Sequence, residues 1–163
     1  MAEYSTLYRI THQRYAEEPF SGKGGLHYRS RWASKGRLVS YGSRHLATAT
    51  LEKIAGVTRA DLLTEMVYAK AEVPVSHIDE LPSDELPDGW AALPPSEATR
   101  RVGDRWLDAG DNLMLRVPAV VLPDCYNYVI NAAHPDAEAL DVVKTDDRFL
   151  DSRVLRRLGT DQE

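Results

Sequence analysis

The stretch that decides the fold runs from Gly22 to Glu52 and reads GKGGLHYRSRWASKGRLVSYGSRHLATATLE. It begins with a glycine-rich loop, passes an Arg-Trp pair, and continues into a short apolar segment that ends at Tyr41. A helical pattern that carries Glu52 follows. Arg31, Tyr41 and Glu52 therefore lie about ten residues apart on three successive elements. Three chemically different side chains in this arrangement can form one side of a binding pocket.

The pattern within this stretch predicts a strand and then a helix. Residues 37–41 are bounded by a glycine on each side, which is typical of a short strand. Ser43 is a candidate N-cap for a helix that ends near Gly56. Glu52 is expected outside the main core, because it falls nearly opposite the centre of the apolar stripe. That stripe comprises Leu46, Ala47, Thr50, Leu51 and Ile54.

The rest of the chain predicts a sheet with few helices. Residues 96–110 fit a second helix with a glycine just beyond its last turn. Residues 74–95 contain five prolines and are expected to be irregular. Strands without regular βαβ alternation predict one α+β domain over residues 1–163, with a twisted, mostly antiparallel or mixed sheet. The remaining strands are expected at 7–10, 63–73, 113–121 (interrupted at 118), 126–130 and 141–144.

Composition narrows the class of protein. Apolar content of 43% and charged content of 28% are ordinary for a globular chain, and no run is long enough for a membrane helix. The N-terminus shows no export signal and Cys125 is the only cysteine, so the cytoplasm is expected. A net charge of −5 argues against direct binding of nucleic acid. The five histidines form no H-x-x-x-H pair, so no metal is expected.

Several short motifs, in this order and spacing, resemble the RES-domain toxins of bacterial toxin-antitoxin modules. The similar blocks extend over residues 8–143, approximately, which is most of the chain. They are Arg31-Trp32, Gly36, Tyr41, Leu51-Glu52, Gly103-Asp104-x-Trp106, Arg116-Val117-Pro118, and Asn127 to Asn131 with His134-Pro135.

The resemblance implies a fold similar to ADP-ribosyltransferase toxins and an enzyme that breaks the bond between nicotinamide and ribose in NAD+. The ADP-ribosyl group then passes to water, phosphate or a protein side chain. The family is named for an Arg, a Glu and a Ser, and this Ser usually follows the Val-Pro pair, where this chain has Ala119. The missing hydroxyl favours a protein acceptor over an NAD+ glycohydrolase or phosphorylase. The resemblance also implies a cognate antitoxin, which we expect to block the active-site cleft.

Two charged side chains suit the chemistry that the resemblance implies. As nicotinamide leaves, positive charge develops on the ribose, and a carboxylate such as Glu52 stabilises it. Arg31 can bind the diphosphate bidentately, and Lys35 adds a second positive charge. Each also has a structural alternative, because Arg31 can simply stack on its neighbour Trp32 and Glu52 can be a solvated helix residue.

Aromatic and amide side chains complete the predicted site. Tyr41 is the candidate that stacks on the cationic nicotinamide ring, with Tyr28 as a second candidate. Tyr41 could equally be ordinary packing at a strand end. Asn131 could orient an amide of the nucleotide, whereas Asn127 is expected to cap the turn before Pro135.

A hypothesis from another class remains open. The chain could be a non-catalytic module that binds a nucleotide or a protein partner, with Ala119 as the sign of lost activity. Such a module would bind NAD+ saturably without turnover. The presence of Arg31, Tyr41 and Glu52 favours the enzyme.

Overall fold

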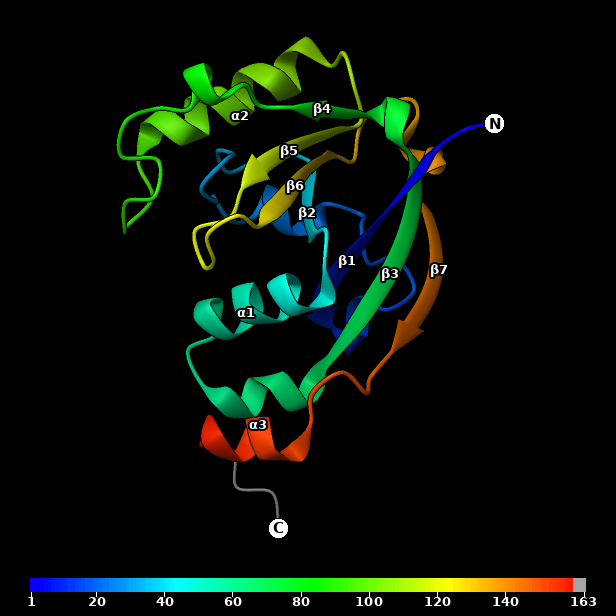
Figure 1. The fold of residues 1–163 in the computed structure, drawn as a ribbon, viewed down its shortest axis with the longest axis vertical. Helices are drawn as coiled ribbons and strands as arrows, with labels where there is room; N and C mark the ends of the chain where they lie inside the picture. The colour runs from blue at the N-terminus through cyan, green and yellow to red at the C-terminus, as the bar shows by residue number, and fades with distance from the viewer. Residues whose placement is uncertain (160–163) are drawn as a thin grey trace.

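A computed structural model describes residues 1–159, so the last four residues of the expected domain range lie outside the described part. The chain forms one seven-stranded sheet in the order β4-β5-β6-β2-β1-β3-β7 (Figure 1). Every neighbouring pair is antiparallel except β4 and β5. The expected mixed α+β sheet is therefore confirmed. The strands are β1 (Tyr4–His12), β2 (Val39–Ser43), β3 (Met66–Pro74), β4 (Ile78–Glu80), β5 (Met114–Pro118), β6 (Tyr126–Asn131) and β7 (Asp141–Asp146).

Three α-helices accompany the sheet in the described residues: α1 (Leu46–Gly56), α2 (Glu97–Ala109) and α3 (Ser152–Arg157). Figure 1 shows α2 at the β4 end of the molecule and α1 at the opposite side of β2, near α3. No helix within residues 1–159 combines the length and apolar character needed to cross a membrane.

Several elements differ in extent from the prediction or were not predicted. Residues 63–65 belong to a 3-10 helix, Ala60–Glu65, so β3 begins later than predicted. The proline-rich segment contains β4, because three consecutive residues without proline pair in parallel with β5. Residues 148–157, which include four arginines, contain the short helix α3.

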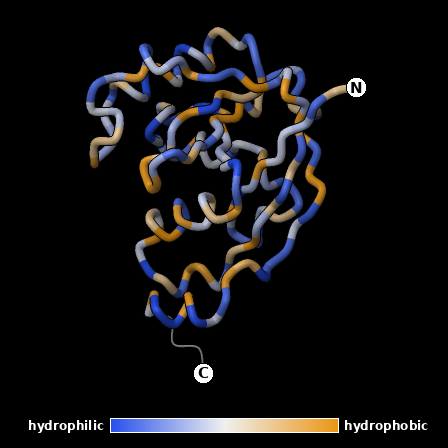
Figure 2. Tube along the Cα trace, viewed as in Figure 1, coloured by the Kyte–Doolittle hydropathy of each residue, from blue (hydrophilic) through white to orange (hydrophobic). Residues whose placement is uncertain are grey.

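Apolar side chains cover both faces of the sheet. Alternation along β1 places Leu7 in the core on one face and Tyr8 and Ile10 in the core that α1 covers, as the period of two predicts. Figure 2 shows the same mixture of polar and apolar positions along the strands. A third cluster lies beneath α2 and is built by Trp32, Ala33, Val39, Leu115, Val117 and Val129.

The buried face of α1 differs from the predicted stripe. Its buried residues are Thr48 and Ala49, whereas Leu51 is 37% exposed. Small side chains allow the helix to lie close to the sheet, so burial follows size and contact rather than hydrophobicity alone. Glu52, one turn after Thr48, is half-buried and directed toward the sheet. The prediction that Glu52 lies opposite the buried face is wrong.

Helix α2 fixes the loop that carries the Arg-Trp pair. A Cβ atom on Gly103 would lie 1.5 Å from the backbone carbonyl oxygen of Trp32, so only glycine permits this approach. The next residue, Asp104, accepts hydrogen bonds from the Ser34 backbone N–H at 2.9 Å and from the Ser34 hydroxyl. It also pairs with Arg37 Nε at 2.9 Å. The Gly-Asp motif thus holds residues 32–37 against the helix.

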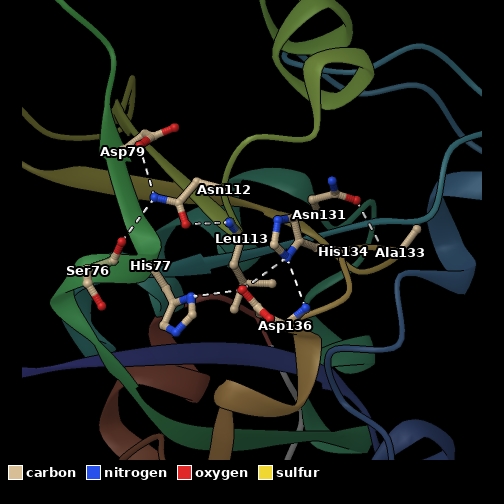
Figure 3. A network of polar contacts seen from close by, with 9 residues as sticks. All are labelled: Ser76, His77, Asp79, Asn112, Leu113, Asn131, Ala133, His134 and Asp136. Atoms are coloured by element: carbon tan, nitrogen blue, oxygen red, sulfur yellow. Dashed lines mark hydrogen bonds and ion pairs between the residues drawn. The ribbon is translucent and has the colours of Figure 1, made fainter.

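A polar network ties the N-terminal end of β5 to neighbouring turns (Figure 3). Asn112 Nδ2 donates to Asp79 Oδ1 at 3.0 Å, which links β4 to the segment before β5. Asp136 lies 3.8 Å from His77 and 3.9 Å from His134. The His-Pro motif therefore belongs to a turn that these contacts connect to the edge of the sheet.

The contact between α2 and the Arg-Trp loop predicts a large effect of one methyl group. Gly103→Ala should destabilise the protein by more than ~3 kcal/mol, because the added carbon overlaps a backbone oxygen that cannot move without its loop. Thermal unfolding followed by circular dichroism measures this. Gly56→Ala is the matched control in α1, where a Cβ meets nothing within 4 Å and stability should be unchanged or slightly higher. Equal melting temperatures for the two variants would contradict this packing.

Candidate active site

The candidate site lies where β2, the Arg-Trp loop and α1 meet. Tyr41 and Ser43 are two residues apart on β2 and so project from the same face of the sheet. The Tyr41 hydroxyl is hydrogen-bonded to the Ser30 hydroxyl, next to Arg31 in sequence. The strand thereby connects the loop that carries Arg31 to the helix that carries Glu52.

Glu52 is held by Asn127, which is in turn held by Ser43. Asn127 Nδ2 donates to Glu52 Oε1 at 2.7 Å. The Ser43 hydroxyl donates to Asn127 Oδ1 at 2.6 Å. Ser43 and Asn127 are directly paired across β2 and β6. A rigid part of the sheet therefore orients a carboxylate that comes from a helix.

These contacts correct two expectations. Asn127 does not cap the turn before Pro135, since its amide joins Ser43 to Glu52. Ser43 is the last residue of β2, and the N-cap of α1 is His45, which makes no side-chain capping bond. Sequence reasoning missed both roles, because they depend on which residues pair across β2 and β6.

Arg31 approaches the site from the loop side. Its Nη1 donates to the backbone carbonyls of Trp90 at 2.6 Å and Ala92 at 2.9 Å. Burial lowers the pKa of Arg31, while the negative charge of Glu52 acts in the opposite direction. The charge of the Glu52 carboxylate thus acts on the Arg31 guanidinium, although the two groups come from different elements and form no direct ion pair within residues 1–159.

Tyr41 has an uncharged phenol in a mostly buried setting. Burial, aided by the charge of Asp104, raises the pKa of Tyr41 to about 12, against the opposing effects of the Ser30 hydrogen bond and the Arg9 charge. Arg9 Nη1 also donates to the Tyr41 carbonyl at 3.0 Å. Tyr41 thus presents a neutral ring in a fixed position.

The other predicted ligands lie in different surroundings. Tyr28 is 77% exposed, and Lys35 is exposed in the turn after the Arg-Trp pair. Asn131 is buried at the other end of β6, where its Oδ1 accepts from the Ala133 N–H at 3.2 Å (Figure 3). The structure therefore connects the strand of Tyr41 to the Arg31 loop through Ser30 and to Glu52 through Asn127, whereas Asn131 lies at the far end of β6, just before a turn.

Ala119, where the resemblance to RES-domain toxins implies a serine, lies just beyond the end of β5. It is 5% exposed, and its N–H donates to the Cys125 carbonyl at 2.8 Å. It follows Val117 by two residues, and Val117 pairs with Asn127. The methyl group thus lies buried just beyond the end of β5.

Two cavities lie elsewhere in the described residues, with none of Arg31, Tyr41 and Glu52 in their linings, and they are less suited to an anionic ligand. One, of about 600 Å³, lies between α2 and β4, and its acidic lining (Asp79, Glu80, Glu85) outnumbers Arg105. The second, of about 510 Å³, is lined by the carboxylates of residues 17, 18 and 138 with only one lysine. Negative linings repel a diphosphate, so charge favours the Arg31 region instead. No group of three or more His, Cys, Asp or Glu side chains suitable for a metal occurs within residues 1–159.

Lys53 follows Glu52 on α1, and its charge gives a prediction about stability. Burial, with a smaller effect of the Arg9 charge, lowers the pKa of Lys53 from 10.5 to about 8. Between pH 8 and 10.5 the unfolded chain therefore binds more protons than the folded one, and stability rises with pH in this window. At pH 7 the substitution Lys53→Met removes a buried charge, whereas near pH 10.5 the lysine is already neutral in the folded protein. The change in the free energy of unfolding caused by Lys53→Met should therefore be more stabilising at pH 7 than near pH 10.5, by ~2 kcal/mol. Chemical denaturation at both pH values measures this, and a difference that does not change with pH would contradict it.

Comparison with known proteins agrees with this fold and with the motifs. The structure resembles the crystal structure of the M. tuberculosis MbcT-MbcA toxin-antitoxin complex, with a TM-score of 0.74 and 16% identity, over 97% of this chain and 90% of that one. Toxin Res of Photorhabdus laumondii is 32% identical over 92% of this chain and 97% of its own length. Toxin Res of Pseudomonas putida is 34% identical over 91% of this chain and 98% of its own.

A further relative carries a more specific name. It is the Prs ADP-ribosylating toxin of a Sphingobium species, 28% identical over 88% of this chain and 91% of its own length. The family model described as RES domain matches residues 6–152, which include every residue of the candidate site. The chain therefore belongs to the RES domain family.

Proposed function

We propose that this chain is the toxin of a toxin-antitoxin module and that it cleaves the nicotinamide-ribose bond of NAD+. The observation that carries the proposal is the Glu52 carboxylate, which Asn127 holds in one orientation at 2.7 Å, together with the Arg31 guanidinium, whose Nη1 donates to two backbone carbonyls. Relatives named as toxins, one of them as an ADP-ribosylating toxin, support the same reading. An anion-binding group beside a carboxylate fits a substrate that has a diphosphate at one end of a ribose and a cationic base at the other.

In the proposed complex, Arg31 binds the diphosphate. Its Nη1 is held by two neutral backbone carbonyls, those of Trp90 and Ala92, and a diphosphate oxygen is a stronger acceptor because it carries charge. Binding would therefore exchange these carbonyls for phosphate oxygens. Lys35, exposed in the same loop, adds a second positive charge at the entrance.

Bond cleavage then requires stabilisation of one developing charge. The C–N bond breaks with its electron pair leaving on nicotinamide, which becomes neutral, and positive charge moves to the ribose. Glu52 Oε1 is occupied by Asn127, so its other oxygen is the one to face the ribose. The neutral ring of Tyr41 packs against the nicotinamide and keeps water from the leaving base.

The acceptor of ADP-ribose distinguishes three versions of this reaction. A protein side chain is our first proposal, because the buried methyl of Ala119 offers no hydroxyl to hold a small acceptor. Water would give free ADP-ribose, and phosphate would give a phosphorylated ADP-ribose. Mass spectrometry of the products with and without phosphate separates the three.

An antitoxin partner completes the proposal. The similar solved structure is a toxin-antitoxin complex, and a partner that covers the Arg31 region would exclude NAD+ by competing for the same positive charge. An acidic or carboxylate group on the partner fits this role. NAD+ at high concentration should then weaken inhibition.

The proposal predicts that Glu52→Gln abolishes turnover without unfolding the protein. The amide oxygen still accepts from Asn127, so the fold is kept, while the negative charge beside the ribose is lost. Release of nicotinamide should fall ~100-fold or more, with an unchanged melting temperature. Full activity of this variant would exclude Glu52 as the carboxylate. Saturable NAD+ binding without any nicotinamide release by the wild-type protein would favour the non-catalytic module.

Arg31→Lys tests the binding role separately. Lysine keeps the positive charge but cannot form two parallel hydrogen bonds to a diphosphate. KM for NAD+ should rise ~10-fold, with a smaller change in kcat. Arg29→Lys is the matched control, since Arg29 is an exposed arginine two residues earlier in the same loop. An equal effect of the two substitutions would contradict the assignment of Arg31.

A further inference from the structure

We infer that Asn127 and Ser43 are positioning residues that set the orientation of the Glu52 carboxylate before substrate binds. The inference rests on the proposed function, because it assigns a purpose to the orientation of Glu52. It adds two residues of the sheet to a site otherwise built from a loop arginine, a strand tyrosine and a helix glutamate. The chain of bonds runs from Ser43 through Asn127 to Glu52.

This chain of hydrogen bonds, called the relay below, begins where β2 pairs with β6. Five consecutive pairs join β2 to β6, and Ser43 opposite Asn127 is the last of them. Directly opposite side chains on one face of a sheet lie close enough to bond without strain. Ser43 is 3% exposed, so its side chain is largely shielded from bulk water. The pair is therefore a fixed platform under α1.

Ser43 decides which way the amide of Asn127 faces. A carboxamide has an oxygen that accepts and a nitrogen that donates, and its two ends are nearly equal in shape. The Ser43 hydroxyl donates to the oxygen at 2.6 Å, which leaves the nitrogen directed at Glu52. The opposite orientation would bring an amide oxygen against a carboxylate oxygen. Ser43 thus acts on Glu52 through Asn127, although it makes no hydrogen bond to Glu52 itself.

The amide of Asn127 makes the two carboxylate oxygens of Glu52 different from each other. It binds Oε1 at 2.7 Å, while Oε2 has no hydrogen-bond partner among the described residues. A group whose position is set before the reaction needs no reorganisation when charge develops, and this is the main source of electrostatic catalysis. Losing Asn127 should therefore reduce kcat more than the affinity for NAD+.

Substitution of Asn127 is the direct test. In Asn127→Ala we expect kcat for nicotinamide release to fall ~100-fold with KM for NAD+ within about two-fold of wild type. Asn127→Asp keeps the shape and the acceptor for Ser43 but places a second carboxylate beside Glu52. Its activity should recover as the pH is lowered, because the new carboxyl donates a hydrogen bond once it is protonated. A purely structural role would not produce this pH dependence.

Substitution of Ser43 tests the relay one step further away. Ser43→Ala should lower kcat ~10-fold, and Ser43→Thr should restore it, since threonine supplies the same hydroxyl. Ser40→Ala is the matched control on the same strand. Ser40 is 1% exposed, and its hydroxyl has no hydrogen-bond partner in the described part of the chain. This variant should retain wild-type kcat.

Two further results separate failure of the inference from failure of the proposed function. If wild-type protein releases nicotinamide and Glu52→Gln does not, but folded Asn127→Ala keeps wild-type kcat, the inference is overturned while the proposed function stands. In the Glu52→Gln background, Asn127→Ala should cause no further loss, because the amide acts only through that carboxylate. An additional full-size loss in the double variant would overturn the positioning role.

Discussion

The pairing of β2 with β6 is the constraint on which the candidate site depends. It places Ser43 opposite Asn127, and α1 begins only three residues after Ser43. The short connection therefore fixes the position of the first turn of α1 relative to the sheet. The small buried residues Thr48 and Ala49 let the helix lie close to the sheet. Glu52 is brought to the amide of Asn127 as a consequence. A shift of one residue in this pairing would place the two polar side chains on opposite faces of the sheet.

A second constraint acts from the opposite side of the site. Gly103 allows α2 to touch the backbone of Trp32, and Asp104 holds Ser34 and Arg37. Arg31 is therefore fixed by its neighbours rather than by its own contacts, which are two exchangeable backbone carbonyls. The sheet orients the negative group and α2 orients the positive one. This division explains how a guanidinium and a carboxylate can coexist without closing into a direct salt bridge.

The sequence predicted the parts of this arrangement that depend on local patterns. Alternation along β1 gave the correct faces, and the glycine after α2 marked its end. The buried face of α1 was wrong, because close packing on the sheet favoured Thr48 and Ala49 over the larger Leu51. The role of Asn127 was missed since it depends on strand register across more than 80 residues of chain, namely 43 to 127. Periodicity carries no information on such a pairing.

The most direct test of the account is a crystal structure of the Glu52→Gln variant with NAD+. We predict the diphosphate on Arg31, released from the carbonyls of Trp90 and Ala92, and the nicotinamide ribose beside position 52. Asn127 should keep the orientation that Ser43 imposes. NAD+ bound in the acidic cavity between α2 and β4, with Arg31 still on its two carbonyls, would contradict the account.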